Sequence, residues 1–134
     1  MNLESILEML VEELKLEALP LKDKNGSFQL KINAETQVSL KELNPGLYFS
    51  AKIMEIPKEE NKEALFIYLM KANLLGKGTG KAAIGIDQSE KYLMLSLTLP
   101  FEVDYTLFHE NLEDLLNYID YWKEEVPRFQ QTLL

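Results

Sequence analysis

Seven apolar residues follow one another from Ala64 to Met70, and this run limits the possible folds more than any other segment. On a helix the run goes almost twice around, so it leaves no wide polar face, and such a helix must be buried on more than one side. One side can pack on the domain's own sheet. We expect the other side to meet a second copy of the chain, since two-fold homodimers are the commonest oligomers. The alternative is a central helix covered by its own neighbours. The predicted dimer-interface residues are Leu65, Phe66, Tyr68, Leu69 and Ala72.

The remaining segments predict an α+β fold with an antiparallel sheet, in a single domain over residues 1–134. Apolar residues recur at helical spacing near both ends of the chain and alternate with polar residues between them. We expect Asn2 and Asp104 to be helix N-caps, and Pro57 to open the second helix with Glu59 and Glu60 in its first turn. The order is helix, three strands, helix, two strands and helix, over residues 3–17, 28–32, 38–40, 47–56, 57–75, 82–87, 91–99 and from 104 onward.

The third and fifth predicted strands each have two different faces, because successive side chains of a strand point to opposite sides. One face is apolar throughout and is expected to be core; it carries Leu47, Phe49, Ala51, Ile53, Leu93, Leu95, Leu97 and Leu99. The other face mixes tyrosine and methionine with polar residues, and such side chains adapt to varied partners. We expect this mixed face to bind a polypeptide, although a covering helix is an equally good explanation. Its predicted contact residues are Tyr48, Met54, Tyr92 and Met94, with Ile56 on the same face.

The segment after the apolar helix has glycines at 76, 78 and 80, followed by Lys81. A phosphate-binding P-loop needs a glycine, four residues, and then Gly-Lys-Ser/Thr. Here Ala82 supplies no hydroxyl for magnesium, and Leu75 stands where the first glycine belongs. The direction is also reversed, because a P-loop runs from a strand into a helix. The segment therefore predicts a helix C-cap at Gly76 followed by a flexible turn.

Composition narrows the class of protein. The net charge of −8 argues against nucleic acid and allows a basic polypeptide partner. The chain has no cysteine and a single histidine, His109, which cannot make a typical zinc site. No segment approaches the roughly 20 apolar residues of a membrane span, and the first residues lack the features of a signal peptide, so we expect a cytoplasmic protein. We predict no catalytic residue, no metal site and no cofactor.

Several short motifs in the second half of the chain match a known family. They are Ala72–Gly76, Gly78–Gly80, Gly85–Asp87, Leu93–Ser96, Leu99–Pro100 and a final helix with Trp122. Together they resemble the hallmark of the class I type III secretion chaperones, the Tir-chaperone (CesT-like) family, and the element order matches along almost the whole chain. Lys77 and Lys81 depart from the small or polar residues common at those positions.

The resemblance implies a small, acidic homodimer in the bacterial cytoplasm without enzymatic activity. Members of this family bind an extended N-terminal segment of a secreted effector, keep it soluble and secretion-competent, and present it to the export apparatus or its ATPase. Their second helix is a main dimer element, which agrees with the run at 64–70. Strand addition suits such binding, because main-chain hydrogen bonds demand little of the partner's sequence.

Two other functions and one other assembly stay open at this point. A regulator that holds a folded export or transcription factor would use the same dimer. A heterodimer with a sister chaperone would use the same apolar helix in place of a homodimer. A nucleotide-dependent enzyme would use the glycine loop and would lose nucleotide binding on removal of Lys81.

Overall fold

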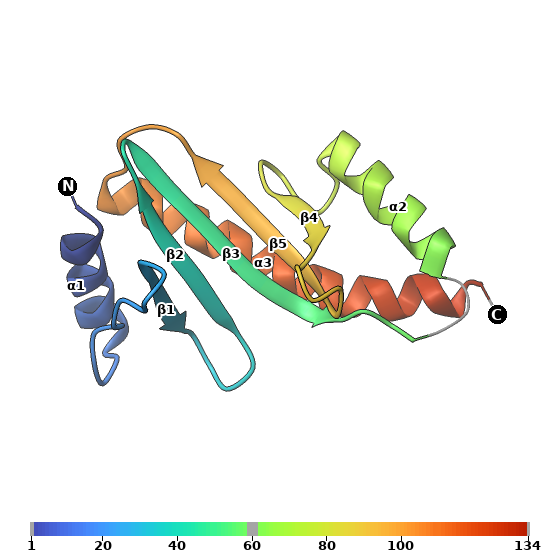
Figure 1. Ribbon diagram of the computed structural model, residues 1–134, viewed down its shortest axis with the longest axis horizontal. Helices are drawn as coiled ribbons and strands as arrows, with labels where there is room; N and C mark the ends of the chain where they lie inside the picture. The colour runs from blue at the N-terminus through green and yellow to red at the C-terminus, as the bar shows by residue number, and fades with distance from the viewer. Residues whose placement is uncertain (1, 59–61, 134) are drawn as a thin grey trace. The chain divides into compact units, whose positions relative to one another are not determined.

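A computed structural model describes residues 2–58 and 62–133 of the chain (Figure 1). The described residues form an α+β fold, as predicted, with an antiparallel sheet in the order β1-β2-β3-β5-β4. The elements are α1 (Leu3–Leu14), β1 (Ser27–Lys31), β2 (Gln37–Leu43), β3 (Gly46–Glu55), α2 (Lys62–Leu75), β4 (Ala83–Ile86), β5 (Tyr92–Leu99) and α3 (Tyr105–Gln131).

The chain divides into two compact units. Unit 1 comprises residues 1–51 and 98–114, and unit 2 comprises residues 52–97 and 115–134. Strands β3 and β5 and helix α3 each contribute residues to both units. The single domain over 1–134 stays a prediction.

Unit 1 packs α1 and the start of α3 with the strands β1 and β2 and the first half of β3. The ring of Phe49 on β3 stacks on Phe108 of α3, with 5.8 Å between the ring centroids. Asn2 caps α1 as predicted, because its side chain accepts a hydrogen bond from the Ser5 amide at 2.8 Å. The helix ends at Leu14 rather than near residue 17, since Lys15 adopts a left-handed conformation with φ 54°.

The alternation along β3 and β5 is confirmed by burial. All eight residues of the predicted apolar face are buried. Ile56 was placed on the mixed face, but it is buried as well. It lies just past the end of β3, and its amide donates to the carbonyl oxygen of Lys91 at 2.8 Å, so the strict alternation does not extend to it.

Helix α2 begins later than the sequence predicted. Pro57 and Lys58 are not helical, and the helix is described from Lys62. Glu59 and Glu60, placed in its first turn by the prediction, lie outside the described residues. In unit 2, α2 runs beside the C-terminal part of α3 (Figure 1), where the Tyr68 hydroxyl donates a hydrogen bond to Glu125.

The glycine loop that follows α2 is held by hydrogen bonds, which corrects the prediction of a flexible turn. Gly76 ends the helix in a left-handed conformation, as predicted, with φ +69°. The Lys77 amide donates to the Ala72 carbonyl oxygen, and the indole Nε1 of Trp122 donates to the Gly78 carbonyl oxygen at 2.8 Å. A Cβ at Gly78 would stand 2.7 Å from the Tyr121 ring, so only glycine allows this close packing on α3.

Candidate functional site

The inner side of α2 is part of the core of unit 2. Leu65, Leu69 and Ala72, three of the predicted dimer-interface residues, are between 0% and 5% exposed. The other two, Phe66 and Tyr68, are half-buried. The structure thus directs most of the predicted interface residues into their own unit.

Tyr68 is fixed to α3 through its hydroxyl and its ring. The hydroxyl bonds the carboxylate of Glu125, which also accepts from Arg128 Nη2 at 2.7 Å, and the ring stacks on Phe129 with 4.3 Å between centroids. Burial, followed by the hydrogen bond to Glu125, raises the pKa of Tyr68 to about 12. The Arg128 hydrogen bond is the main cause that lowers the pKa of Glu125 below its ordinary value. Tyr68 therefore supports the packing of α2 on α3.

The outer side of α2 carries large apolar side chains that nothing in the described unit covers. Ile67, Met70 and Leu74 are 47%, 69% and 87% exposed. They are spaced at i, i+3 and i+7, so they form one stripe of the helix. The spacing was readable in the sequence, but the sequence did not show which stripe faces outward. Beside this stripe lies an apolar hollow of about 320 Å³ between α2 and β4; its apolar lining includes Phe66, Leu69, Met70, Ile84, Ile86 and Leu93.

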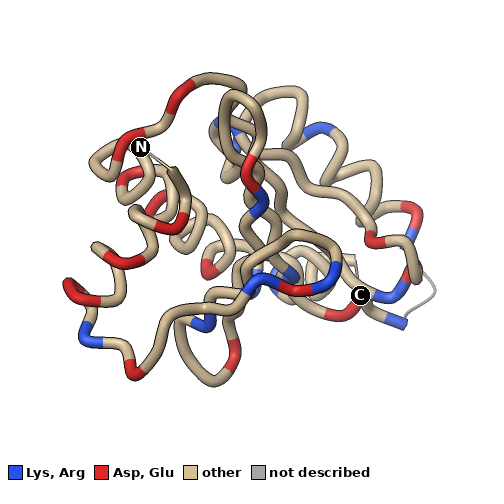
Figure 2. Tube along the Cα trace, turned by 60° about the vertical axis from the view of Figure 1, so that its left-hand side comes forward, with Lys and Arg blue, Asp and Glu red and all other residues tan. Residues whose placement is uncertain are grey.

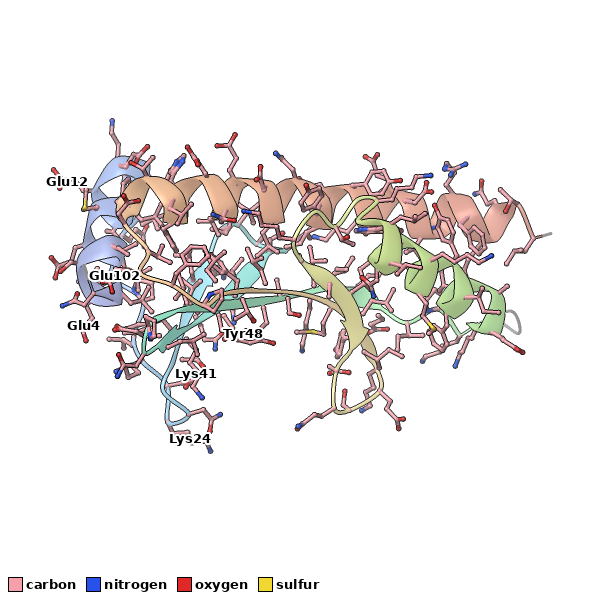
Figure 3. All side chains as sticks on the ribbon, turned by 90° about the horizontal axis from the view of Figure 1, so that it is seen from above. Glu4, Glu12, Lys24, Lys41, Tyr48 and Glu102 are labelled. Atoms are coloured by element: carbon pink, nitrogen blue, oxygen red, sulfur yellow. The ribbon has the colours of Figure 1, made fainter. Side chains whose placement is uncertain are left out.

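The mixed face of the sheet is divided between the two units. Tyr48 belongs to unit 1 and is 36% exposed, and it lies with Lys41 on the side of the strands away from α3 (Figure 3). Met54, Tyr92 and Met94 belong to unit 2 and are half-buried. The ring of Tyr92 is partly covered, because Lys52 Nζ lies 4.0 Å from its centroid.

Sequence reasoning missed a groove in unit 1 beside the strand β1. It has a volume of about 470 Å³ and is formed by the segment after α1, by β1 and by the turn that follows. Leu19 and Leu21 of the same segment are 47% and 84% exposed. The repeated leucines between residues 14 and 21 were the available signal, since they continue beyond the end of the helix. The apolar residues that line the groove are Leu16, Ala18, Pro20, Leu30, Ile32 and Ala34.

Acidic and basic residues are unequally distributed between the units. Unit 1 contains 13 acidic and five basic residues, whereas unit 2 contains nine of each, so the net charge of −8 lies entirely in unit 1. Acidic positions recur along the segment that follows the N mark in Figure 2. His109 lies among these charges, with its Nε2 3.6 Å from Glu13 Oε1 and its side chain 37% exposed.

The described residues show little that suggests metal or phosphate chemistry. In the ranges 2–58 and 62–133, no group of three or more acidic or histidine side chains could hold a metal ion. Four loop amides, those of Lys77, Thr79, Gly80 and Ala82, donate to carbonyl oxygens of the same segment instead of pointing at a shared anion site. Among residues 2–58 and 62–133, none of the helices has both the length and the hydropathy that a membrane span requires.

Several solved structures share this fold, and one of them is a type III secretion chaperone. The ExsC–ExsE complex matches with a TM-score of 0.73 and 20% identity, over 92% of this chain and 95% of that one. The Yersinia pestis type III secretion chaperone SycH, in complex with a fragment of YscM2, has a TM-score of 0.65 and 17% identity, over 90% and 98%. YbjN, a putative transcription regulator from E. coli, has a TM-score of 0.64 and 13% identity, over 97% and 94%.

The sequence comparisons agree with the fold. A Chlamydia pneumoniae protein, CPj0713/CpB0740, is 24% identical over 105 residues, which cover 78% of this chain and 80% of that protein. The family model described as the Tir chaperone protein (CesT) family matches residues 5–123, which is most of the chain. With its fold shared by class I type III secretion chaperones, this chain belongs to the Tir chaperone protein (CesT) family.

Proposed function

We propose that this protein is a cytoplasmic type III secretion chaperone without enzymatic activity, which binds the extended N-terminal segment of a secreted effector and keeps it soluble and secretion-competent. Membership of the family supports this function. So does the similarity to SycH, which was solved with a fragment of another protein bound. Delivery to the export apparatus or its ATPase is part of the same proposal.

The observation that carries the proposal is the groove of unit 1. It lies beside β1, the first strand in the sheet order, where the chain's own Lys22 bridges Phe28, so an extended segment placed there would run along the rest of this sheet edge, beside residues 29–31. Its floor is apolar, since Leu30 is 1% exposed, and side chains of the segment would gain free energy by burial there. The acidic excess of unit 1 favours a segment that carries basic residues.

The mixed face provides a second candidate surface for the effector. Tyr48 in unit 1 and Met54, Tyr92 and Met94 in unit 2 retain enough exposure to contact a partner. A segment that is ordered on binding loses conformational entropy, so useful affinity requires a large contact area. We therefore propose that both the groove and the mixed face take part.

Capture of clients tests this function. A tagged copy is isolated from its native cytosol and the bound proteins are identified by mass spectrometry. We expect a secreted protein, whose capture is lost when its N-terminal region is deleted. Two double variants separate the surfaces: Ala18→Lys with Ala34→Lys charges the groove with the sign that repels a basic segment, and Met54→Glu with Met94→Glu charges the mixed face. Each should lower the yield of the client at least about tenfold, because a charge is placed against apolar side chains.

The controls are Asn117→Glu and Asn117→Lys, which change an exposed residue of α3 in unit 2 outside both surfaces and should leave the client yield unchanged. Capture of folded cytosolic proteins alone would contradict the chaperone proposal. It would favour a regulator that holds a folded partner, a function consistent with the fold shared with YbjN.

We also propose that the chain forms a dimer through α2, with the outward stripe of Ile67, Met70 and Leu74 at the contact. Exposed apolar side chains of this size are typical of an interface. Met70→Asp should weaken the dimer about 100-fold or more, because the contact would bury a charge, and light scattering should then show a monomer. Asn117→Asp, at an exposed position of α3 away from this stripe, is the control. A Met70→Asp protein that stays dimeric would place the interface elsewhere.

A further inference from the structure

The side chain of Asn73 bonds the backbone of the strand β4. Its Oδ1 accepts from the Ile84 amide at 2.7 Å, and its Nδ2 donates to the Ile84 carbonyl oxygen at 2.8 Å. A carboxamide offers the same donor and acceptor as a peptide unit. Asn73, in the last turn of α2, therefore makes the two hydrogen bonds that a neighbouring strand would make to Ile84.

These two backbone groups belong to the open edge of the sheet. β4 is the last strand in the sheet order and pairs with β5 alone. The Asp87 amide donates to the Tyr92 carbonyl oxygen, and hydrogen-bonded pairs alternate along an antiparallel ladder. Ala83 and Gly85 therefore direct their backbone groups to β5, while Ile84 and Ile86 direct theirs to the edge. An added strand would need the backbone groups of both Ile84 and Ile86, and Asn73 already bonds those of Ile84.

We propose that Asn73 closes the β4 edge of the sheet against strand addition. An uncovered edge strand accepts any extended chain, including another copy of the same protein. A protein that binds extended segments must restrict such pairing to the intended edge. This benefit of the closure rests on the proposed function. The hydrogen bonds between Asn73 and Ile84 do not depend on it.

The chemistry of the contact accounts for asparagine at this position. An ionised aspartate would still accept from the Ile84 amide, but it would place a negative oxygen against the Ile84 carbonyl. Leucine would fill a similar volume and bond neither group. Asn73 is thus a positioning residue whose two hydrogen-bonding atoms match the two backbone groups of Ile84.

Hydrogen exchange of the full-length protein, measured by NMR, tests the closure. In the unmodified protein, the Ile84 amide should exchange at least about tenfold more slowly than the Ile86 amide, because Asn73 bonds only the first. Asn73→Ala and Asn73→Leu should remove most of that difference, whereas Asn117→Ala, at an exposed position of α3, should preserve it. Equal exchange of Ile84 and Ile86 in the unmodified protein would overturn the proposal, whether or not the variants fold.

Self-association then reports whether the edge has opened. With the chain itself as the probe, the molar mass of both Asn73 variants in light scattering should rise with concentration above that of the unmodified protein, and the Ile86 amide should become protected as two β4 edges pair. A mass equal to that of the unmodified protein and an unprotected Ile86 at the highest concentration would overturn the proposal. Failure of the proposed function has a different signature: the unmodified protein would capture no secreted client, while its Ile84 amide stayed protected.

Discussion

Replacing Gly46 with alanine is expected to destabilise the protein by about 3 kcal/mol or more, since strained backbone and a steric clash add together. Gly46 begins β3 with φ +116°, a conformation that residues with a side chain rarely adopt. A Cβ there would stand 2.1 Å from the backbone oxygen of Leu99 and 3.1 Å from the Cα of Pro100. Both neighbours are backbone atoms, so the clash can be relieved only by moving the strands apart.

Two other glycines separate the contributions to this effect. Gly26 has φ +83° but no atom within 4 Å of an added Cβ, so Gly26→Ala should cost about 1 kcal/mol from backbone strain alone. Gly85 has neither a positive φ nor a neighbour within 4 Å, and Gly85→Ala should be close to neutral. Urea unfolding followed by circular dichroism measures all three variants. If Gly46→Ala were no worse than Gly26→Ala, the close approach to Leu99 would be wrong.

Trp122→Ala is expected to cost about 3–5 kcal/mol, the range for removal of a large buried aromatic side chain. Trp122 is fully buried in unit 2 and contacts the ring of Tyr68 edge-on, with 6.0 Å between centroids. The substitution would also leave the Gly78 carbonyl oxygen without its indole donor. The glycine loop would then lose its anchor on α3, and the C-terminal end of α2 would lose support.

Trp122→Phe distinguishes volume from hydrogen bonding. It retains most of the ring volume but has no donor for Gly78, so it should cost about 1–2 kcal/mol. Because Trp122 is the single tryptophan, far-UV circular dichroism must replace fluorescence as the probe of unfolding. A loss below about 1 kcal/mol for Trp122→Ala would contradict the burial of this side chain.

Hydrophobic spacing predicted the internal side of most elements. Alternating leucines from Leu93 to Leu99 predicted a strand with one buried face, and all four are buried. Trp122 of the final helix is buried as well. These predictions hold because burial of apolar area is the dominant favourable term in folding, and its period depends only on local backbone geometry.

The sequence predicted less well the features that depend on packing against another helix or strand, namely which side of α2 is buried and where α2 begins. The apolar run of α2 fits two stripes equally well, and only packing on β4 and α3 turned Leu65 and Leu69 inward and left Met70 and Leu74 outside. Pro57 is a good first residue for a helix, yet the hydrogen bond of the preceding Ile56 to Lys91 keeps this stretch with the sheet.

The sequence alone determined the α+β class, the element order, the core faces of β3 and β5, and a resemblance to the secretion chaperones that the family match confirmed. These follow from local periodicity, capping residues and short motifs. The tertiary structure decided which stripe of α2 is exposed, where the groove of unit 1 lies, and that Asn73 bonds Ile84. Such features depend on side chains that meet from segments distant in the chain, and no local pattern records which of them come together.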